Sequence, residues 1–182
     1  MVRLVRTFLV PYGGGARASQ MLRLACQLAA IDGDRVVALY VNLVHPTLPL
    51  RELPDELDRP GRLTLLHAST VAEAVPGSPA SFRYEAMLVR GRDLSRSIVG
   101  QARILQADAI FMAPRQRRPW WRRVLSGLLS TSTTSQVVRL APCAVIVGYP
   151  PGCRAGPASL QAGSAVAEAE RHLLAGTHGH IM

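Results

Sequence analysis

Residues 108–149 constrain the fold more than any other part of the chain, because they combine two short apolar runs with a helix between them. Ala109–Met112 and Ala144–Val147 are the apolar runs, and residues 124–140 have helix-like apolar spacing. Strands that are apolar on both faces and joined by a helix indicate a parallel sheet. A ligand is expected at the carboxyl end of such a strand, where the loop opens onto a helix N-terminus.

The preceding residues alternate between expected strands and helices. Residues 4–10, 36–44 and 82–89 are expected strands, and residues 18–31, 62–75 and 93–106 are expected helices, the last capped by Asp93. Residues 45–61 contain four prolines and are expected to form a loop. Five strands alternating with four helices predict a doubly wound α/β domain with a five-stranded parallel sheet.

Length and composition indicate one domain with a tail. The chain has 182 residues and is 48% hydrophobic, enough for a single buried core, which we place in residues 1–150. Residues 151–182 are rich in Gly and Ala, with one amphipathic helix expected near 159–174, and are either loosely docked or disordered. No apolar stretch is long enough to span a bilayer, and the N-terminus runs into a strand rather than a signal peptide, so a cytoplasmic protein is expected.

The cysteines and basic residues exclude several kinds of site. The three cysteines include no CxxC pair, which disfavours a metal knuckle or disulfide framework; Cys26 and Cys143 lie in apolar runs and are expected in the core. All 21 basic residues are arginine, so a P-loop or Schiff-base lysine is excluded. The formal net charge is +9, with a cluster at Arg115, Arg117, Arg118, Arg122 and Arg123 that repels itself unless an anion, an acidic surface or solvent relieves it.

Four local sequences, read in this order of elements, resemble the universal stress protein family. They are Leu9-Val10-Pro11 before a glycine turn, Val89-Arg90-Gly91, residues 107–112, and residues 137–147, which are the most specific. The resemblance covers residues 4–149. It implies a five-stranded parallel sheet, a homodimer through the last strand, and, in some members, ATP or AMP at the carboxyl ends of the strands.

The chain departs from this family at the ligand residues. ATP-binding members carry an aspartate after the first strand, where this chain has Tyr12-Gly13, and a glycine pattern after the fourth strand, where Ala113 and Thr131 replace glycines and only the hydroxyl at Ser132 remains. A backbone phosphate cradle needs glycine, so ATP or AMP binding is expected to be weak or absent. Should a nucleotide bind, the resemblance places it at these residues: Tyr12, Gly13, Gly14, Val41, Ala113, Arg115, Ser132 and Thr133.

Two readings remain open for the hydroxyl and arginine residues of the long loop. Residues 130–135 offer six hydroxyls near a helix N-terminus, which either contact an anion or supply one N-cap with the others solvated. Arg115, Arg117 and Arg118 either replace the missing glycines as phosphate ligands or form a solvated basic loop.

The two tryptophans point to a partner surface. Trp120 and Trp121 are adjacent and do not share one face, so at least one is expected to meet solvent, a protein partner or a membrane surface, while the other can fill the core. Nucleic acid is less favoured, because no second basic stripe or stacking series is present. The predicted partner-binding surface consists of Arg117, Arg118, Trp120, Trp121, Arg122 and Arg123.

Catalysis and metal binding find little support in the sequence. His45 and His67 are isolated, no Ser-His-Asp or HExxH spacing is present, and neither a metal nor an obligatory cofactor is expected. An acidic patch, Glu52, Asp55, Glu56 and Asp58, either is solvated or pairs with the basic loop. Three functions follow: a non-catalytic dimer that binds a partner or an anionic ligand, a nucleotide-binding protein with an arginine-based phosphate site, and a subunit docked on a membrane-associated assembly through the loop at 115–123.

Overall fold

The computed structural model describes residues 5–48, 54–76, 81–113 and 132–148. All of them belong to the first of two units into which the chain divides, residues 1–150. The helix expected near 159–174, the loop arginines and both tryptophans lie outside the described residues.

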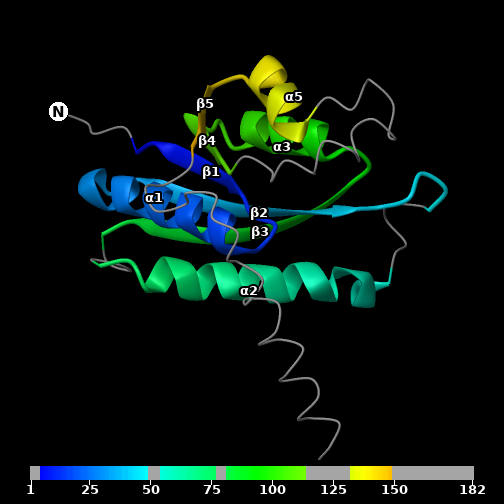
Figure 1. The fold of residues 1–182 in the computed structure, drawn as a ribbon, viewed down its shortest axis with the longest axis horizontal. Coiled ribbons are helices and arrows are strands. Elements are labelled where there is room, and N and C mark those ends of the chain that lie inside the picture. The colour runs from blue at the N-terminus through cyan, green and yellow to red at the C-terminus, as the bar shows by residue number, and fades with distance from the viewer. Residues whose placement is uncertain (1–4, 49–53, 77–80, 114–131, 149–182) are drawn as a thin grey trace, which may run out of the picture. The chain divides into compact units, whose positions relative to one another are not determined.

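A five-stranded, fully parallel sheet forms the centre of the described unit (Figure 1). Its strands are β1 (Thr7–Pro11), β2 (Arg35–Leu43), β3 (Arg83–Gly91), β4 (Ala109–Met112) and β5 (Ala144–Val147). Their order across the sheet is β3-β2-β1-β4-β5, with Leu9 opposite both Val37 and Ile110. The predicted doubly wound parallel sheet is therefore confirmed.

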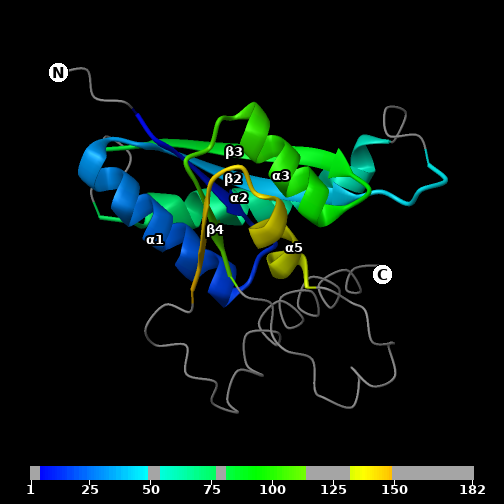
Figure 2. The ribbon, with the colours of Figure 1, turned by 90° about the horizontal axis from the view of Figure 1, so that it is seen from above.

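Helices cover both faces of the sheet. Helices α1 (Ala16–Asp32) and α2 (Arg59–Glu73) pack on one face, and α3 (Leu94–Ile104) and α5 (Thr133–Leu140) pack on the other (Figures 1 and 2). Alternate residues of each strand point to opposite faces. Val10 and Phe111 therefore join the core beneath α1 and α2, while Leu9 and Ile110 join the core beneath α3 and α5. Burial on both faces explains the unbroken apolar run of β4. The equally apolar β5 lies at the edge of the sheet and is largely exposed.

The expectation of a loop throughout residues 45–61 is wrong at its end. Asp55–Asp58 forms a short 3-10 helix, η1, and α2 begins at Arg59, with Pro60 in its first turn, where proline is well tolerated. Gly61 lies inside α2 because the helix approaches the sheet closely there. A Cβ at this position would lie 2.6 Å from Leu88 Cδ1 and from Tyr40 Cδ1.

The chain changes direction between β1 and β4. Its first two crossovers, through α1 and α2, place β2 and β3 on one side of β1, and the next, through α3, places β4 on the other side. In open α/β sheets the carboxyl ends of the strands at such a switch point form the binding crevice. In the described part of the chain, no helix is both long and apolar enough to cross a membrane.

Candidate functional site

The turn after β1 is built from Tyr12 and three glycines. Gly14 and Gly15 have φ values of 82° and 84°, a region that side chains with a Cβ rarely adopt, and Gly15 begins α1 without a side-chain cap. Gly13 has no such constraint, and a Cβ placed on it would meet no atom within 4 Å. The space beside Gly13, at the switch point, is therefore open.

The Tyr12 side chain does not reach this open space. Its ring is 1% exposed and lies in the core beneath α1 and α2. The phenol oxygen lies 2.8 Å from Ser19 Oγ and 2.7 Å from His67 Nδ1, and Ser19 in turn donates to the Gly15 carbonyl. Burial raises the pKa of Tyr12, although the Ser19 hydrogen bond and the charge of Arg23 oppose that shift. Tyr12 thus ties α1 to α2 with its side chain and leaves only its backbone facing the turn.

The carboxyl end of β4 and the start of α5 flank the long loop, residues 113–132. Of this loop the structure describes only Ala113 and Ser132. Ala113 follows β4 and packs against the core beneath α1 and α2. Ser132 is the N-cap of α5, where its hydroxyl accepts the Ser135 N–H at 3.2 Å and also contacts the Ser135 hydroxyl at 2.8 Å. Ser132 therefore supplies the expected N-cap, and Thr133 is the first residue of the helix.

A charged cluster lies at the carboxyl ends of β2 and β3. Arg90 on β3 donates to both carboxylate oxygens of Asp58, at 2.8 Å from Nη2 to Oδ2 and 3.3 Å from Nε to Oδ1. Asn42 on β2 donates to the same carboxylate at 2.8 Å. The hydrogen bond from Arg90, and then that from Asn42, holds the pKa of Asp58 below its usual value, while the pKa of Arg90 is raised. Asp55 Oδ1 also lies 3.5 Å from Arg90 Nη2. Two residues of the acidic patch, Asp55 and Asp58, therefore form ion pairs with Arg90 of β3.

The structure brings only part of the predicted ligand set to the switch point. Tyr12, Gly13 and Gly14 follow β1, and Ala113 follows β4, its neighbour in the sheet. Val41 is half-buried on β2 and packs against the core beneath α3 and α5. The structure does not describe Arg115 or the six residues of the predicted partner-binding surface, so those assignments stay predictions.

Sequence reasoning missed the pairs Asp58–Arg90 and Tyr12–His67. Arg90 follows the apolar run Ala86–Val89 at the end of β3, and this charge at the carboxyl end of a strand is a signal that could have pointed to the first pair. Nothing local pointed to the second, since His67 stands alone in the sequence but bonds Tyr12, 55 residues away, in the fold.

At the carboxyl edge of the sheet, the described residues present backbone N–H groups to a ligand rather than reactive side chains. Turns with glycine at positive φ expose backbone N–H groups, and the start of a 17-residue helix adds a partial positive charge. Asp58 and Arg90 are engaged with each other, and Tyr12 with Ser19 and His67. Among the described residues, no three His, Cys, Asp or Glu side chains gather in a group that could hold a metal ion.

Comparison with protein families gives one match. The model of the universal stress protein family matches residues 5–148, most of the chain. None of the curated proteins that were compared matches it.

Solved structures share the fold at low sequence identity. A universal stress protein in complex with cAMP superposes with a TM-score of 0.59 at 18% identity, covering 79% of this chain and 97% of the other. A universal stress protein from Archaeoglobus fulgidus in complex with dAMP gives 0.57 at 20% identity, covering 80% and 98%. UspA from Lactobacillus plantarum gives 0.56 at 23% identity, covering 79% and 97%. At these identities the likeness concerns the fold.

Proposed function

Because the chain belongs to the universal stress protein family, we propose that it is a non-catalytic binding protein, a homodimer that acts through a partner or an anionic ligand. The observation that carries this proposal is the turn after β1. Gly13 leaves open space where the family resemblance implies an aspartate, and the buried Tyr12 side chain is hydrogen-bonded to Ser19 and His67 of its own domain. The turn offers backbone N–H groups to an anion but no carboxylate to hold a ribose.

Calorimetry with AMP, cAMP and Mg-ATP tests the ligand side of this proposal. We expect Mg-ATP to bind no more tightly than roughly millimolar, and incubated nucleotide to remain intact by chromatography. Low-micromolar affinity or steady hydrolysis would contradict a binding protein without a nucleotide site. Mass spectrometry of small molecules and proteins that copurify with the native protein identifies the ligand or partner.

A second candidate function is nucleotide binding, which the cAMP and dAMP complexes of the two solved proteins favour. Here Gly13→Asp is informative, because the added side chain meets no atom within 4 Å and φ at Gly13 is not positive. If the rest of the site is intact, this carboxylate accepts a ribose hydroxyl and tightens AMP binding by about tenfold. Gly13→Asn is the matched control, since it adds a side chain of the same shape at the same unstrained position without the charge.

The dimer is proposed to form through β5, an edge strand of the sheet. Ile146 and Val147 are 38% and 41% exposed there, and an uncovered apolar edge invites pairing with another chain. Light scattering should give a dimer mass for the full chain. Ile146→Arg with Val147→Arg should give a folded monomer, whereas a wild-type monomer at high concentration would refute the dimer.

A third candidate is docking on a membrane-associated assembly through residues 115–123. What favours it is the sequence alone, two adjacent tryptophans among five arginines. Trp120→Ala with Trp121→Ala should abolish such an interaction and leave the melting temperature within a few degrees. A loss of roughly 3 to 5 kcal/mol in the free energy of unfolding would instead identify one indole as part of the core.

A further inference from the structure

Two leucines of α2 lie on its solvent side rather than in the core. Leu63 is 60% exposed and Leu66 is 64% exposed, and the two are one helical turn apart. Leu65 and Ala68, by contrast, are buried in the core between α2 and the sheet. Figure 1 shows the sheet on one side of α2, and no other described helix or strand lies on the opposite side. Helix α2 therefore has a second apolar side that the described part of the domain does not cover.

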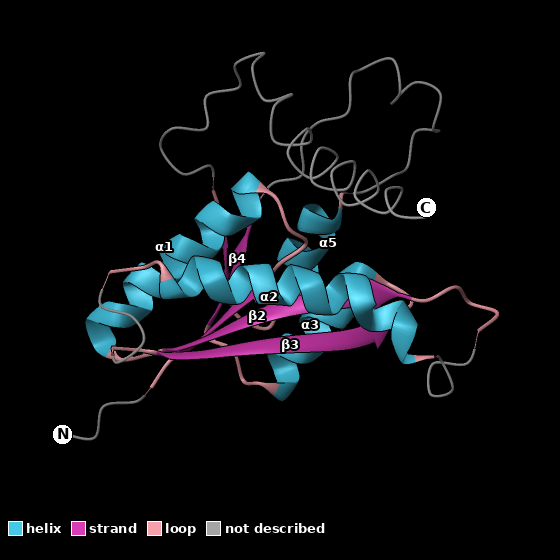
Figure 3. Ribbon diagram, turned by 90° about the horizontal axis from the view of Figure 1, so that it is seen from below, coloured by secondary structure: helices cyan, strands magenta, loops and turns pink. Residues whose placement is uncertain are grey.

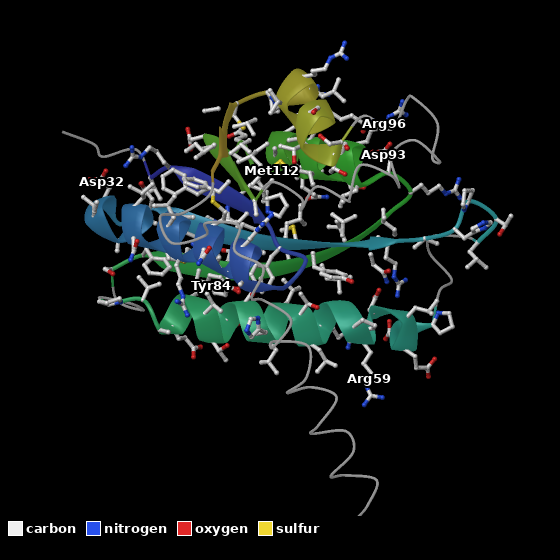
Figure 4. The ribbon with its side chains drawn as sticks, in the orientation of Figure 1. Asp32, Arg59, Tyr84, Asp93, Arg96 and Met112 are labelled. Atoms are coloured by element: carbon white, nitrogen blue, oxygen red, sulfur yellow. The ribbon has the colours of Figure 1, made fainter. Side chains whose placement is uncertain are left out.

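Exposed residues at spacings of three and four form this outer side of α2. They are Arg59, Leu63, Leu66, Thr70 and Glu73, named here the α2 strip. Figure 4 shows Arg59 pointing away from the sheet. The strip begins with Arg59 and ends with Glu73, about 21 Å apart along the helix axis, and the two leucines lie between these opposite charges.

Both charges lie at the unfavourable end of the helix. Arg59 is the first residue of α2 and Glu73 is the last, whereas the helix dipole favours acidic groups in the first turn and basic groups in the last. Neither residue forms a salt bridge with another described residue. Arg62, the remaining arginine of α2, has Asp55 at 3.8 Å from its Nη2 to Oδ1. Within the described part of the domain, the two end charges of the α2 strip thus lack an ion-pair partner.

A second copy of α2 in antiparallel orientation supplies both missing partners. In such a pair, Leu63 of one chain packs against the partner's Leu66, and the reverse contact follows by symmetry. Arg59 then lies about one helical turn from the partner's Glu73, within reach of its long side chain. Each end charge meets its opposite and the exposed leucines become covered. The α2 strip is therefore complementary to itself, as an isologous interface requires.

We propose that two copies of the chain associate through antiparallel pairing of their α2 strips. Helix α2 packs on β2 and β3, at the other side of the sheet from β5, so this contact depends neither on pairing through β5 nor on a ligand at the glycine turn. Two short strips bury much less than the roughly 1,600 Å² of a standard interface, so a weak Kd of roughly 0.1 to 1 mM is expected. Well below this concentration the contact is open and does not change the mass of a dimer formed through β5.

Sedimentation equilibrium of the full chain, up to about 1 mM, tests the proposal. The average mass should rise with concentration both in the wild type and in Ile146→Arg with Val147→Arg, because the association does not use β5. A wild-type protein that is a monomer when dilute, and whose mass doubles at high concentration, would refute pairing through β5 and still support pairing through α2.

Removal of the leucines tests which surface associates. Leu63→Gln with Leu66→Gln should weaken the association by roughly tenfold or more, because it removes the apolar part of the strip. Leu28→Gln with Ile31→Gln is the matched control, since it removes an exposed apolar pair from α1, where these side chains are 39% and 72% exposed. This control should change the association by less than about threefold.

Charge reversal tests the antiparallel orientation. Arg59→Glu alone, or Glu73→Arg alone, gives both ends of the strip the same charge, so each variant should associate with itself roughly tenfold more weakly than the wild type. An equimolar mixture of the two variants should associate to within about threefold of the wild type, because each end of one strip then faces the opposite charge on the other. Neither variant should melt at a lower temperature, since each substitution suits the helix dipole better.

Three outcomes would overturn the proposal. One is a mass that does not rise with concentration in either protein. Another is equal weakening by the Leu28 and Ile31 pair, which would indicate non-specific contact between apolar side chains. The last is a mixture of the Arg59 and Glu73 variants that associates as weakly as each variant alone, which would exclude an antiparallel pair.

Discussion

The phenol oxygen of Tyr12 lies 2.7 Å from Nδ1 of His67, and this hydrogen bond joins the end of β1 to the middle of α2. Figure 3 shows α1 and α2 lying across the same face of the sheet, and the buried Tyr12 ring lies in the core that these two helices cover. The residue beside the glycine turn is therefore also a structural link. A substitution of the Tyr12 side chain should therefore lower the free energy of unfolding more than it lowers the affinity for a ligand at the glycine turn.

Tyr12→Phe tests the link directly. The substitution keeps the ring but removes the oxygen that contacts Ser19 and His67, and we expect a loss of ~1–2 kcal/mol in the free energy of unfolding. Urea denaturation measures it. His67→Ala should lose less, because His67 is exposed and Tyr12 keeps its bond to Ser19. An equal or larger loss in His67→Ala would contradict this view of the pair.

Stability should fall at alkaline pH because of buried neutral groups. Burial raises the pKa of the Cys26 thiol to about 12 and that of Tyr84 to about 12, from ordinary values of 9.0 and 10.0. The unfolded chain releases these protons first, so their stabilising contribution is complete below about pH 9 and declines as the pH rises toward 12. For Cys26 the slope approaches ~1.4 kcal/mol per pH unit.

Urea denaturation between pH 8 and pH 11 measures this slope, with Cys26→Val as the comparison. The variant keeps an apolar side chain of similar size and removes the titrating thiol. Its stability should decline less steeply above about pH 9, whatever its stability at neutral pH. Identical slopes in the two proteins would exclude Cys26 as a source of the alkaline loss.

Two helical glycines should respond in opposite ways to alanine. At Gly61 the added Cβ would lie 2.6 Å from side-chain atoms of Leu88 and Tyr40, so Gly61→Ala should cost ~1–3 kcal/mol. At Gly100 the same atom meets open space, so Gly100→Ala should stabilise α3 by ~0.5–1 kcal/mol. Thermal and urea unfolding measure both variants. A neutral Gly61→Ala would mean that α2 can move away from the sheet at little cost.

Ser132→Ala should destabilise the domain by ~1 kcal/mol, because it removes the hydroxyl that accepts the Ser135 N–H at the start of α5. Thr134→Ala is the control, since it leaves this cap in place. If Ser132 also contacts an anion, Ser132→Ala lowers ligand affinity as well as stability. A stability loss with unchanged affinity would leave capping as its role.

The sequence determined those features that depend on neighbouring residues. The apolar run Ala109–Met112 identified β4, a strand buried on both faces, since such a strand needs no polar side. Asp93 was predicted to be the N-cap of α3, and its side chain accepts the Arg96 N–H at 2.8 Å. A cap acts within one helical turn, so local sequence suffices to identify it.

Only the tertiary structure decided which distant side chains meet. Asp58 pairs with Arg90 across 32 residues and Tyr12 with His67 across 55, and in each case the partner is set by how α2 lies on the sheet. The prolines of residues 45–61 suggested a loop, but packing of Gly61 against Tyr40 and Leu88 lets α2 begin at Arg59. Local propensity is a fraction of a kcal/mol per residue, so burial of a helix against a sheet outweighs it.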